Sequence, residues 1–303
     1  MRYGFIGLGH LGAHLALNLT RKGFKVTVHD QNKTAAKRLL DAGAQWADTA
    51  KGCAAASNAV ITCLPSPTAS RSVLTGQNGV LDGLSTGGTW IEMSTNDRSE
   101  IEQIAALAST KGITTLEAPV TGGVHKAAAG EITVLVGGDA ATYQAHLPAL
   151  KAMGGEVFHM GPLGTASVIK VITNMLAFIH LVAVGEALML AKKGGLDLAQ
   201  VFEAIKASSG NSFVHETESQ VILNGSYNIG FTMDLACKDL GFAHQLGREF
   251  GVPLELGGVT EQIFRRAHAQ YGGHVWSSQV VKLLEDALHT DLRAPGFPDV
   301  LDG

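Results

Sequence analysis

The 303-residue sequence predicts an α/β protein in which a doubly wound sheet is followed by an all-helical second domain. Three observations support this fold class. Residues 3–30 read as a strand, a glycine-rich turn, an amphipathic helix and a second strand. Short β-type runs then alternate with helical patterns up to about residue 161. From Thr165 the alternation stops, and a long apolar helical pattern over residues 168–193 begins a helical remainder that extends to about residue 291.

The first glycine-rich turn has the spacing GxGxxG and lies between a strand and a helix, which is the dinucleotide-binding fingerprint in its required context. Gly7 permits the tight turn, Gly9 lets the backbone approach a pyrophosphate, and Gly12 lets the helix pack close to the strand. Asp30 ends the second strand, where a ribose 2′-hydroxyl is expected. The sequence therefore predicts a Rossmann-type sheet whose cofactor-binding residues include Gly7, Leu8, Gly9, His10, Leu11, Gly12 and Asp30.

Further strands are expected in the first half, at Ala59–Leu64, Thr89–Glu92, Gly112–Leu116, Glu131–Val136 and Glu156–His159. With a boundary near residues 161–164, we expect a dinucleotide-binding domain over 1–162. A helical substrate and dimerisation domain is expected over 163–303, beginning with a long interdomain helix.

The apolar helix over residues 168–191 is long enough to span a membrane, but it contains Asn174, His180, Gly185 and Glu186. Such residues are costly in lipid, so we expect no membrane association and a helix buried between domains or subunits. The second domain offers limited surface to cover this helix, which predicts a homodimer or homotetramer.

Composition narrows the functional classes. A 46% hydrophobic share with 17% charged residues argues against disorder, and a net charge of −4 argues against nucleic-acid binding. The three cysteines form no CxxC pair, and Met1 lies close to the first strand, so a cytoplasmic protein without a leader peptide is expected. No histidine or cysteine cluster has metal-ligand spacing, and His10 and His14 are interpreted as packing or solvent-facing residues, so no metal is predicted.

Three later segments are candidates for chemistry. Thr121, Gly122 and Gly123 follow a predicted strand and can present a hydroxyl and successive N–H groups to a carboxylate; the alternative is a plain connecting loop. Lys170 and Asn174 lie four residues apart on one helix face, although a single lysine there is often a surface residue. The adjacent Lys238 and Asp239 can equally be a solvated charge pair.

In this order, these segments resemble the β-hydroxyacid dehydrogenase family, which includes 3-hydroxyisobutyrate dehydrogenases and tartronate semialdehyde reductases. The resemblance spans nearly the whole chain. It implies that Thr121, Gly122 and Gly123 bind the substrate carboxylate, that Lys170 is catalytic and that Asn174 positions the substrate. It further implies that Lys238 contacts both substrate and cofactor. The remaining cofactor-side residues implied by it are Leu64, Pro65, Ser94, Thr95, Phe231 and Asp239.

The sequence departs from the family pattern at two places. Thr121 stands where the family usually has serine, which keeps the hydroxyl but adds a methyl group. The segment Gly272–Ser278 lacks an acidic residue that the family often has there.

The expected function is hydride transfer between a nicotinamide cofactor and a small β-hydroxy acid, or the corresponding semialdehyde or keto acid. Lys170 is expected to act as general acid and base. Asp30 favours NAD over NADP. The alternatives are an imine reductase-like enzyme, which would replace the lysine with another proton donor, and a non-catalytic dinucleotide-binding protein, which would not need Lys170.

Overall fold

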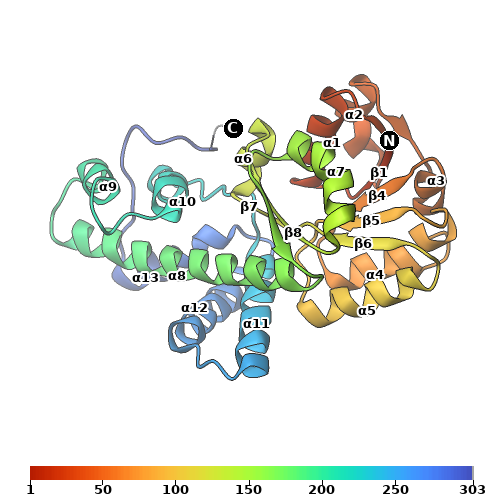
Figure 1. Ribbon diagram of the computed structural model, residues 1–303. Helices are drawn as coiled ribbons and strands as arrows, with labels where there is room; N and C mark the ends of the chain where they lie inside the picture. Colours follow the sequence, from red (N-terminus) through yellow and green to blue (C-terminus); the bar gives the residue numbers. More distant parts are fainter. Residues whose placement is uncertain (302–303) are drawn as a thin grey trace. The chain divides into compact units, whose positions relative to one another are not determined.

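The computed structural model describes residues 1–301, and their contacts divide the chain into two compact units. The first unit extends from Met1 to Lys170, and the second begins at Val171. Figure 1 shows strands and helices in the first unit, and helices joined by loops in the second. This arrangement confirms the predicted fold class.

The first unit contains a nine-stranded sheet with the path β3-β2-β1-β4-β5-β6-β8-β7, and β9 pairs with β8. All neighbouring strands from β3 to β6 along this path are parallel. Strand β8 runs antiparallel to β6 and β7 and parallel to β9. The strands are β1 Arg2–Ile6, β2 Lys25–His29, β3 Gln45–Trp46, β4 Ala59–Thr62, β5 Thr89–Glu92, β6 Thr114–Glu117, β7 Val120–Thr121, β8 Thr133–Gly137 and β9 Val157–Gly161.

Each strand predicted in the first half is present, but its bounds shift by up to two residues. Strands β3 and β7 were not predicted, because two residues are too few to show an alternating pattern. Strand β4 ends at Thr62, two residues before the predicted end.

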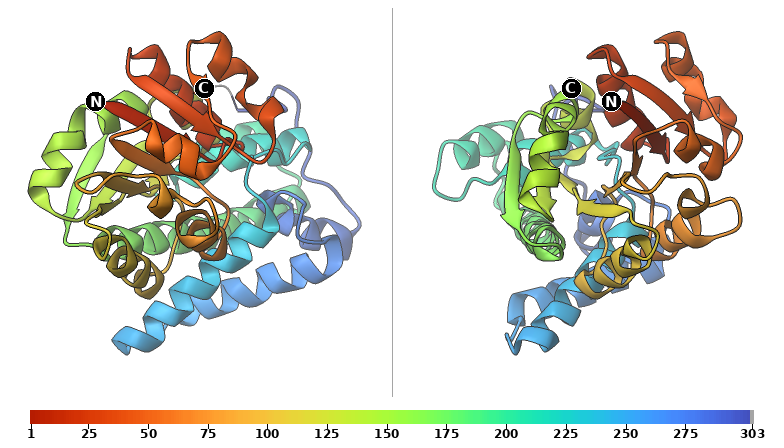
Figure 2. Two further views of the ribbon diagram at one scale, coloured as in Figure 1. Left: turned by 90° about the vertical axis from the view of Figure 1, so that its right-hand side faces the viewer. Right: turned by 45° about the vertical axis from the view of Figure 1, so that its right-hand side comes forward.

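Helices cover both faces of the sheet, as Figures 1 and 2 show. One buried cluster joins the strands to Leu15 of α1, Leu39 of α2 and Leu150 of α7. The opposite cluster contains Ala54 of α3, Leu74 of α4 and residues of α5. This two-sided cover is the doubly wound arrangement. The helical elements are α1 Gly12–Arg21, η1 Lys33–Ala36, α2 Lys37–Asp41, α3 Ala50–Ala55, α4 Pro67–Thr75, η2 Val80–Asp82, α5 Arg98–Ser109, α6 Gly123–Ala129 and α7 Ala140–Met153.

Helix α8 spans Thr165–Lys193, so the division between the units falls within it. In the second unit, its side chains Phe178, Leu181 and Leu188 pack in one cluster with residues of α9 to α13. Helices α11 and α12 lie side by side (Figure 2). The elements after α8 are α9 Leu198–Lys206, α10 Phe213–Asn224, α11 Met233–Phe250, α12 Glu255–Tyr271, η3 Ser277–Val281 and α13 Lys282–Leu288.

Candidate active site

The glycine turn after β1 is held close to its neighbours at two positions and is open at a third. Gly7 has φ +96°, and a Cβ there would lie 2.3 Å from the Cys63 carbonyl oxygen. A Cβ at Gly12 would lie 2.0 Å from the Gly7 carbonyl oxygen. Apart from its two chain neighbours, no described residue has an atom within 4 Å of a Cβ built at Gly9. The turn therefore packs tightly on its protein side and leaves room for a ligand at Gly9, as a bound pyrophosphate requires.

Asp30 lies beside this turn. Its Oδ2 accepts a hydrogen bond from the Leu8 N–H at 2.7 Å, and its Oδ1 accepts one from the Asn32 N–H at 2.8 Å. Leu8 itself is buried, Leu11 is half-buried and His10 is exposed. The structure thus brings Asp30 and the glycine turn together, with the carboxylate fixed in orientation.

The two other predicted cofactor-side loops follow β4 and β5 and are bonded to each other. The Leu64 N–H donates to the Ser94 Oγ at 2.7 Å, and the Ser94 N–H donates to the Glu92 Oε1 at 2.7 Å. Pro65 is exposed and Thr95 is half-buried. Because β1, β4 and β5 are parallel neighbours, the turn and both loops lie at the carboxyl ends of adjacent strands, where open α/β sheets bind ligands.

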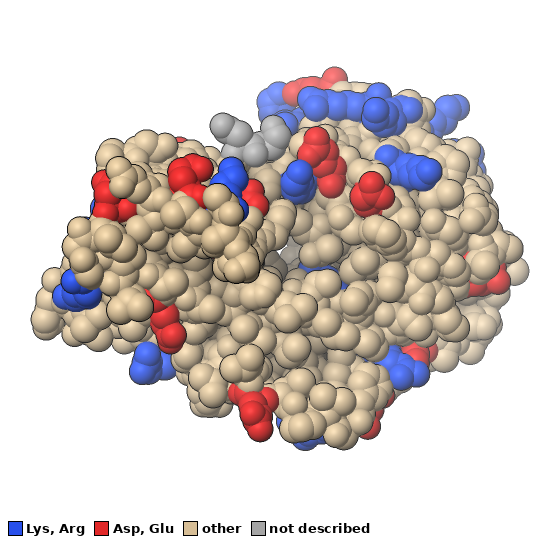
Figure 3. All heavy atoms as spheres, turned by 60° about the vertical axis from the view of Figure 1, so that its left-hand side comes forward, with Lys and Arg blue, Asp and Glu red and all other residues tan. Residues whose placement is uncertain are grey.

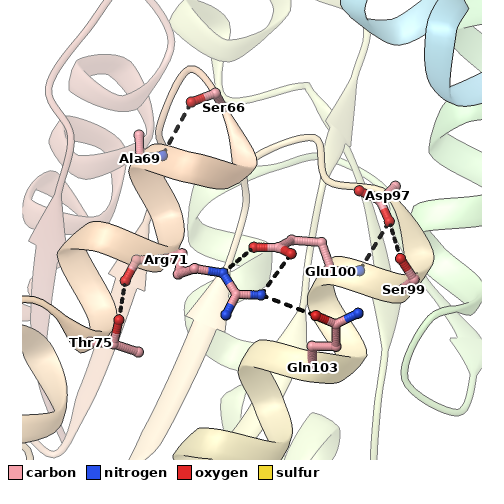
Figure 4. A network of polar contacts seen from close by, with 8 residues as sticks. All are labelled: Ser66, Ala69, Arg71, Thr75, Asp97, Ser99, Glu100 and Gln103. Carbon is pink, nitrogen blue, oxygen red and sulfur yellow. Dashed lines mark hydrogen bonds and ion pairs between the residues drawn. The ribbon is translucent and has the colours of Figure 1, made fainter.

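An ion pair also joins the helices that follow these loops. Arg71 of α4 donates to both carboxylate oxygens of Glu100 of α5, each at 2.8 Å, and to Gln103 (Figure 4). Ser66 caps the start of α4 and Asp97 caps the start of α5. These caps and the Arg71–Glu100 pair fix where each loop ends.

The predicted carboxylate loop begins at the end of β7. Gly122 and Gly123 have φ +124° and +87°, a conformation that other residues rarely adopt. Asn18 of α1 donates to the Ala127 carbonyl oxygen at 2.8 Å, so α6 is tied to the helix that follows the glycine turn. Successive N–H groups beside the Thr121 hydroxyl can bind an anion in this loop.

Lys170 lies in the second turn of α8 and is 7% exposed. Since α8 is continuous, Asn174 lies about one helical turn further on. Burial of an ammonium is costly, which distinguishes Lys170 from an ordinary surface lysine.

Asp239 is hydrogen-bonded to two predicted site residues of the second unit, Asn174 and Lys238. It is 1% exposed; its Oδ2 accepts from the Asn174 amide and its Oδ1 from the Lys238 ammonium, both at 2.6 Å. The Lys238 ammonium also lies 4.8 Å from the centre of the Phe242 ring. The Lys238–Asp239 pair is thus largely buried rather than solvated. Phe231 is half-buried beside Phe178, with ring centres 6.1 Å apart.

Three buried polar residues of the first unit were not singled out from the sequence. The Glu117 carboxylate accepts hydrogen bonds from the Ala166 and Ser167 N–H groups at the start of α8. Glu92 supports Ser94, and burial raises the pKa of its carboxyl group. Asn96 is 2% exposed, and neither polar atom of its amide has a hydrogen-bond partner among residues 1–301. An acidic residue at the end of an apolar strand is the only sequence signal that indicates the two glutamates.

Comparison with known proteins identifies the family. The family model for the NAD-binding domain of 6-phosphogluconate dehydrogenase matches residues 2–161. The model for the NAD-binding of NADP-dependent 3-hydroxyisobutyrate dehydrogenase matches residues 164–284. The chain is 34% identical over 286 residues to 2-(hydroxymethyl)glutarate dehydrogenase of Eubacterium barkeri, covering 94% of this chain and 95% of that protein. The chain belongs to the β-hydroxyacid dehydrogenase family.

Two further relatives support this family assignment. The 3-hydroxyisobutyrate dehydrogenase of Pseudomonas aeruginosa is 34% identical over 284 residues, which cover 90% of this chain and 95% of that protein. The solved structure of Mycobacterium tuberculosis 3-hydroxyisobutyrate dehydrogenase with L-serine matches with a TM-score of 0.83 at 31% identity, covering 94% of this chain and 99% of that chain. The protein is an NAD(P)-dependent hydroxyacid dehydrogenase that acts on CH–OH groups, which confirms the enzyme class expected from the sequence.

Proposed function

We propose that the enzyme interconverts a small β-hydroxy acid and its semialdehyde or keto acid, with Lys170 as the general acid and base. The burial of Lys170 is the observation that most supports this role. Oxidation requires that the hydroxyl proton leaves while hydride moves to the nicotinamide, which supplies the hydride chemistry when bound. An amine can accept this proton, and the ammonium can return it in the reverse direction. Proton transfer of this kind by a positioned side chain is general acid and base catalysis.

The substrate carboxylate is assigned to the loop of Thr121, Gly122 and Gly123. The positive φ of both glycines supports this assignment, because it aims backbone N–H groups that side-chain-bearing residues could not present in the same way. The Thr121 hydroxyl adds a further donor. These groups would fix the acid end of the substrate and leave its hydroxyl free to react.

Asn174 is assigned to orientation of the substrate hydroxyl, and Lys238 to contacts with substrate and cofactor. The hydrogen bonds from both side chains to the buried Asp239 support these assignments, because a shared anchor fixes their positions. In this scheme Asp239 acts through its two neighbours. Phe231 remains a predicted cofactor contact.

For the cofactor we propose a preference for NAD. The carboxylate of Asp30 would repel a 2′-phosphate by roughly 1 to 4 kcal/mol at about 4 Å, whereas the ribose hydroxyls of NAD can donate to it. Lys33 and Arg38 follow Asp30 in sequence and would soften this discrimination. Comparison of kcat/KM for NAD and NADP tests the assignment: a several-fold or larger advantage for NAD is expected, and equal or better use of NADP would refute it.

The substrate class is small 3-hydroxy acids. The relatives that are similar to this chain include a 2-(hydroxymethyl)glutarate dehydrogenase, an NAD-dependent L-serine dehydrogenase and an L-threonate dehydrogenase. A panel of such acids, read by the absorbance of reduced nicotinamide, tests the proposal. We expect turnover of at least one acid and none of cyclic imines in the reductive direction; the reverse result would favour an imine reductase.

We further infer a cytoplasmic homodimer or homotetramer. The most apolar window of α8 has a mean hydropathy of 1.9, which by length and composition alone would suffice for a membrane span, and 39% of that window is buried. Most of the face drawn in Figure 3 is formed by residues other than Lys, Arg, Asp and Glu. The exposed Leu176 and Leu190 of α8 support contact with a second subunit.

A further inference from the structure

Glu117 ends strand β6 and is 1% exposed. Its Oε1 accepts a hydrogen bond from the Ala166 N–H at 2.9 Å, and its Oε2 accepts one from the Ser167 N–H at 3.0 Å. The Ser167 hydroxyl also donates to Oε2. One side chain therefore holds the first turn of α8 through three hydrogen bonds.

These bonds suit an ionised carboxylate. The first N–H groups of a helix have no partner within the helix, and negative charge is stabilised near them. Burial raises the pKa of the Glu117 carboxyl group, while its hydrogen bonds with Ser167 and Ala166 act in the opposite direction. Because both oxygens accept hydrogen bonds, the ionised form fits the geometry better than a protonated one.

Strand β8 leaves room for this carboxylate through one glycine. Gly137 pairs with Glu117 across the antiparallel β6–β8 contact. A Cβ at Gly137 would lie 2.2 Å from the Glu117 Oε1. Any larger residue at this position would have to displace the carboxylate from the start of α8.

Glu117 lies close to two parts of the proposed site. Along the chain, Thr121 follows Glu117 by four residues, so the end of β6 leads directly into the carboxylate loop. On α8, Lys170 follows Ser167 by three residues, which is about 4.5 Å along the helix axis. The contact thus joins the segment that would bind the substrate acid to the turn that bears the proposed base.

We propose that Glu117 is a positioning residue that sets the place of Lys170 relative to the carboxylate loop; this inference rests on the proposed role of Lys170. A β-hydroxy acid has a fixed spacing between its carboxylate and its reacting hydroxyl. The enzyme must match that spacing, and a misplacement of about 1 Å can lower the rate about 10²-fold. Glu117 keeps this spacing by joining β6 directly to α8.

Two variants displace the carboxylate by independent routes. Glu117→Gln keeps the size of the side chain but turns one acceptor into a donor that faces an N–H group. Gly137→Ala retains Glu117 and pushes it away from α8. The matched controls are Glu102→Gln on α5, where the side chain is 44% exposed, and Gly258→Ala on α12, where a Cβ meets its nearest atom at 3.7 Å.

For both test variants, the folded fraction, the Kd for NADH, and kcat and KM for the best acid are measured across pH. We expect NADH affinity within about twofold of wild type, because the glycine turn is untouched, and kcat lowered about 10²-fold. KM should change much less than kcat. In Gly137→Ala the pH at which kcat/KM for oxidation rises should stay unchanged, because no ionisable group is removed. Both controls should behave as wild type.

Folded variants with wild-type kcat would show that Glu117 only stabilises the fold, and would overturn the inference. If both variants fail to fold, Ser167→Ala decides, because it removes one hydrogen bond and leaves the carboxylate in place. A fall in its kcat of several-fold supports the inference, and an unchanged kcat overturns it. Lys170→Ala separates the two proposals: an active Lys170→Ala refutes the proposed function, whereas an inactive Lys170→Ala beside fully active Glu117 variants refutes only the positioning role.

Discussion

Asp239 uses each of its carboxylate oxygens for a different side chain of the proposed site, Asn174 on α8 and Lys238 on α11. A buried carboxylate with two such partners is stable only while both bonds are made, because an unpaired buried charge is costly. Asp239 therefore fixes the orientation of both neighbours without needing to touch the substrate.

Replacing this anchor should weaken catalysis more than folding. In Asp239→Asn the new NH₂ group faces one of two donors, so either Asn174 or Lys238 loses its acceptor. We expect kcat/KM to fall about 10- to 100-fold. Steady-state kinetics and a thermal melt measure this, with Asp234→Asn, whose side chain is 52% exposed, as the control. A variant as active as wild type would show that the anchor is dispensable.

At the scale of elements, the carboxylate loop depends on two successive glycines in left-handed conformations. A Cβ at Gly123 would be strained by its φ of +87° and would lie 3.1 Å from the His125 ring. A substitution there should redirect the N–H groups of the loop and leave the turn after β1 unchanged.

Gly123→Ala should therefore raise KM for the acid while the Kd for NADH stays near the wild-type value. Loss of one charge-assisted hydrogen bond corresponds to about 1.5 to 3 kcal/mol, or roughly a 10- to 150-fold increase in KM. An uncharged amide analogue should be a poor substrate of the wild type for the same reason. Comparable turnover of acid and amide would place the carboxylate elsewhere.

Features that depend on one short segment could be predicted from the sequence, whereas contacts between distant elements could not. The glycine turn and Asp30 lie within 30 residues of the N-terminus and follow from local sterics, so their placement was predictable. The residues that donate to Glu117 lie 49 and 50 positions away, and Asp239, which accepts from Asn174, lies on another helix. No local pattern encodes such contacts, because they depend on tertiary packing.

At the scale of the whole molecule, α8 is a long apolar helix whose own chain leaves much of its surface uncovered. Its most apolar window is 39% buried, and Leu190 is 77% exposed. Exposed apolar side chains on one long helix are typical of a subunit interface.

We expect light scattering at micromolar concentration to show a dimer or tetramer. The double variant Leu176→Glu with Leu190→Glu should shift the enzyme toward the monomer, because each charge would have to be buried in the interface. Leu107→Glu, at a 41% exposed leucine of α5, is the matched control and should keep the wild-type mass. A monomeric wild type would contradict the assembly proposed here.

The central claim is that Lys170 transfers the proton, and kcat of Lys170→Ala on the best acid tests it most directly. Lys170→Ala removes the proton acceptor, whereas Lys170→Arg keeps the charge but cannot exchange a proton near neutral pH. Wild-type kcat/KM for oxidation should rise with pH as the amine loses its proton, and this rise should be absent in the alanine variant. Both variants should fold and bind NADH, with kcat lowered about 10² to 10⁴-fold. A loss smaller than about tenfold, in folded Lys170→Ala that still binds NADH, would contradict the account and assign the proton transfer to another residue.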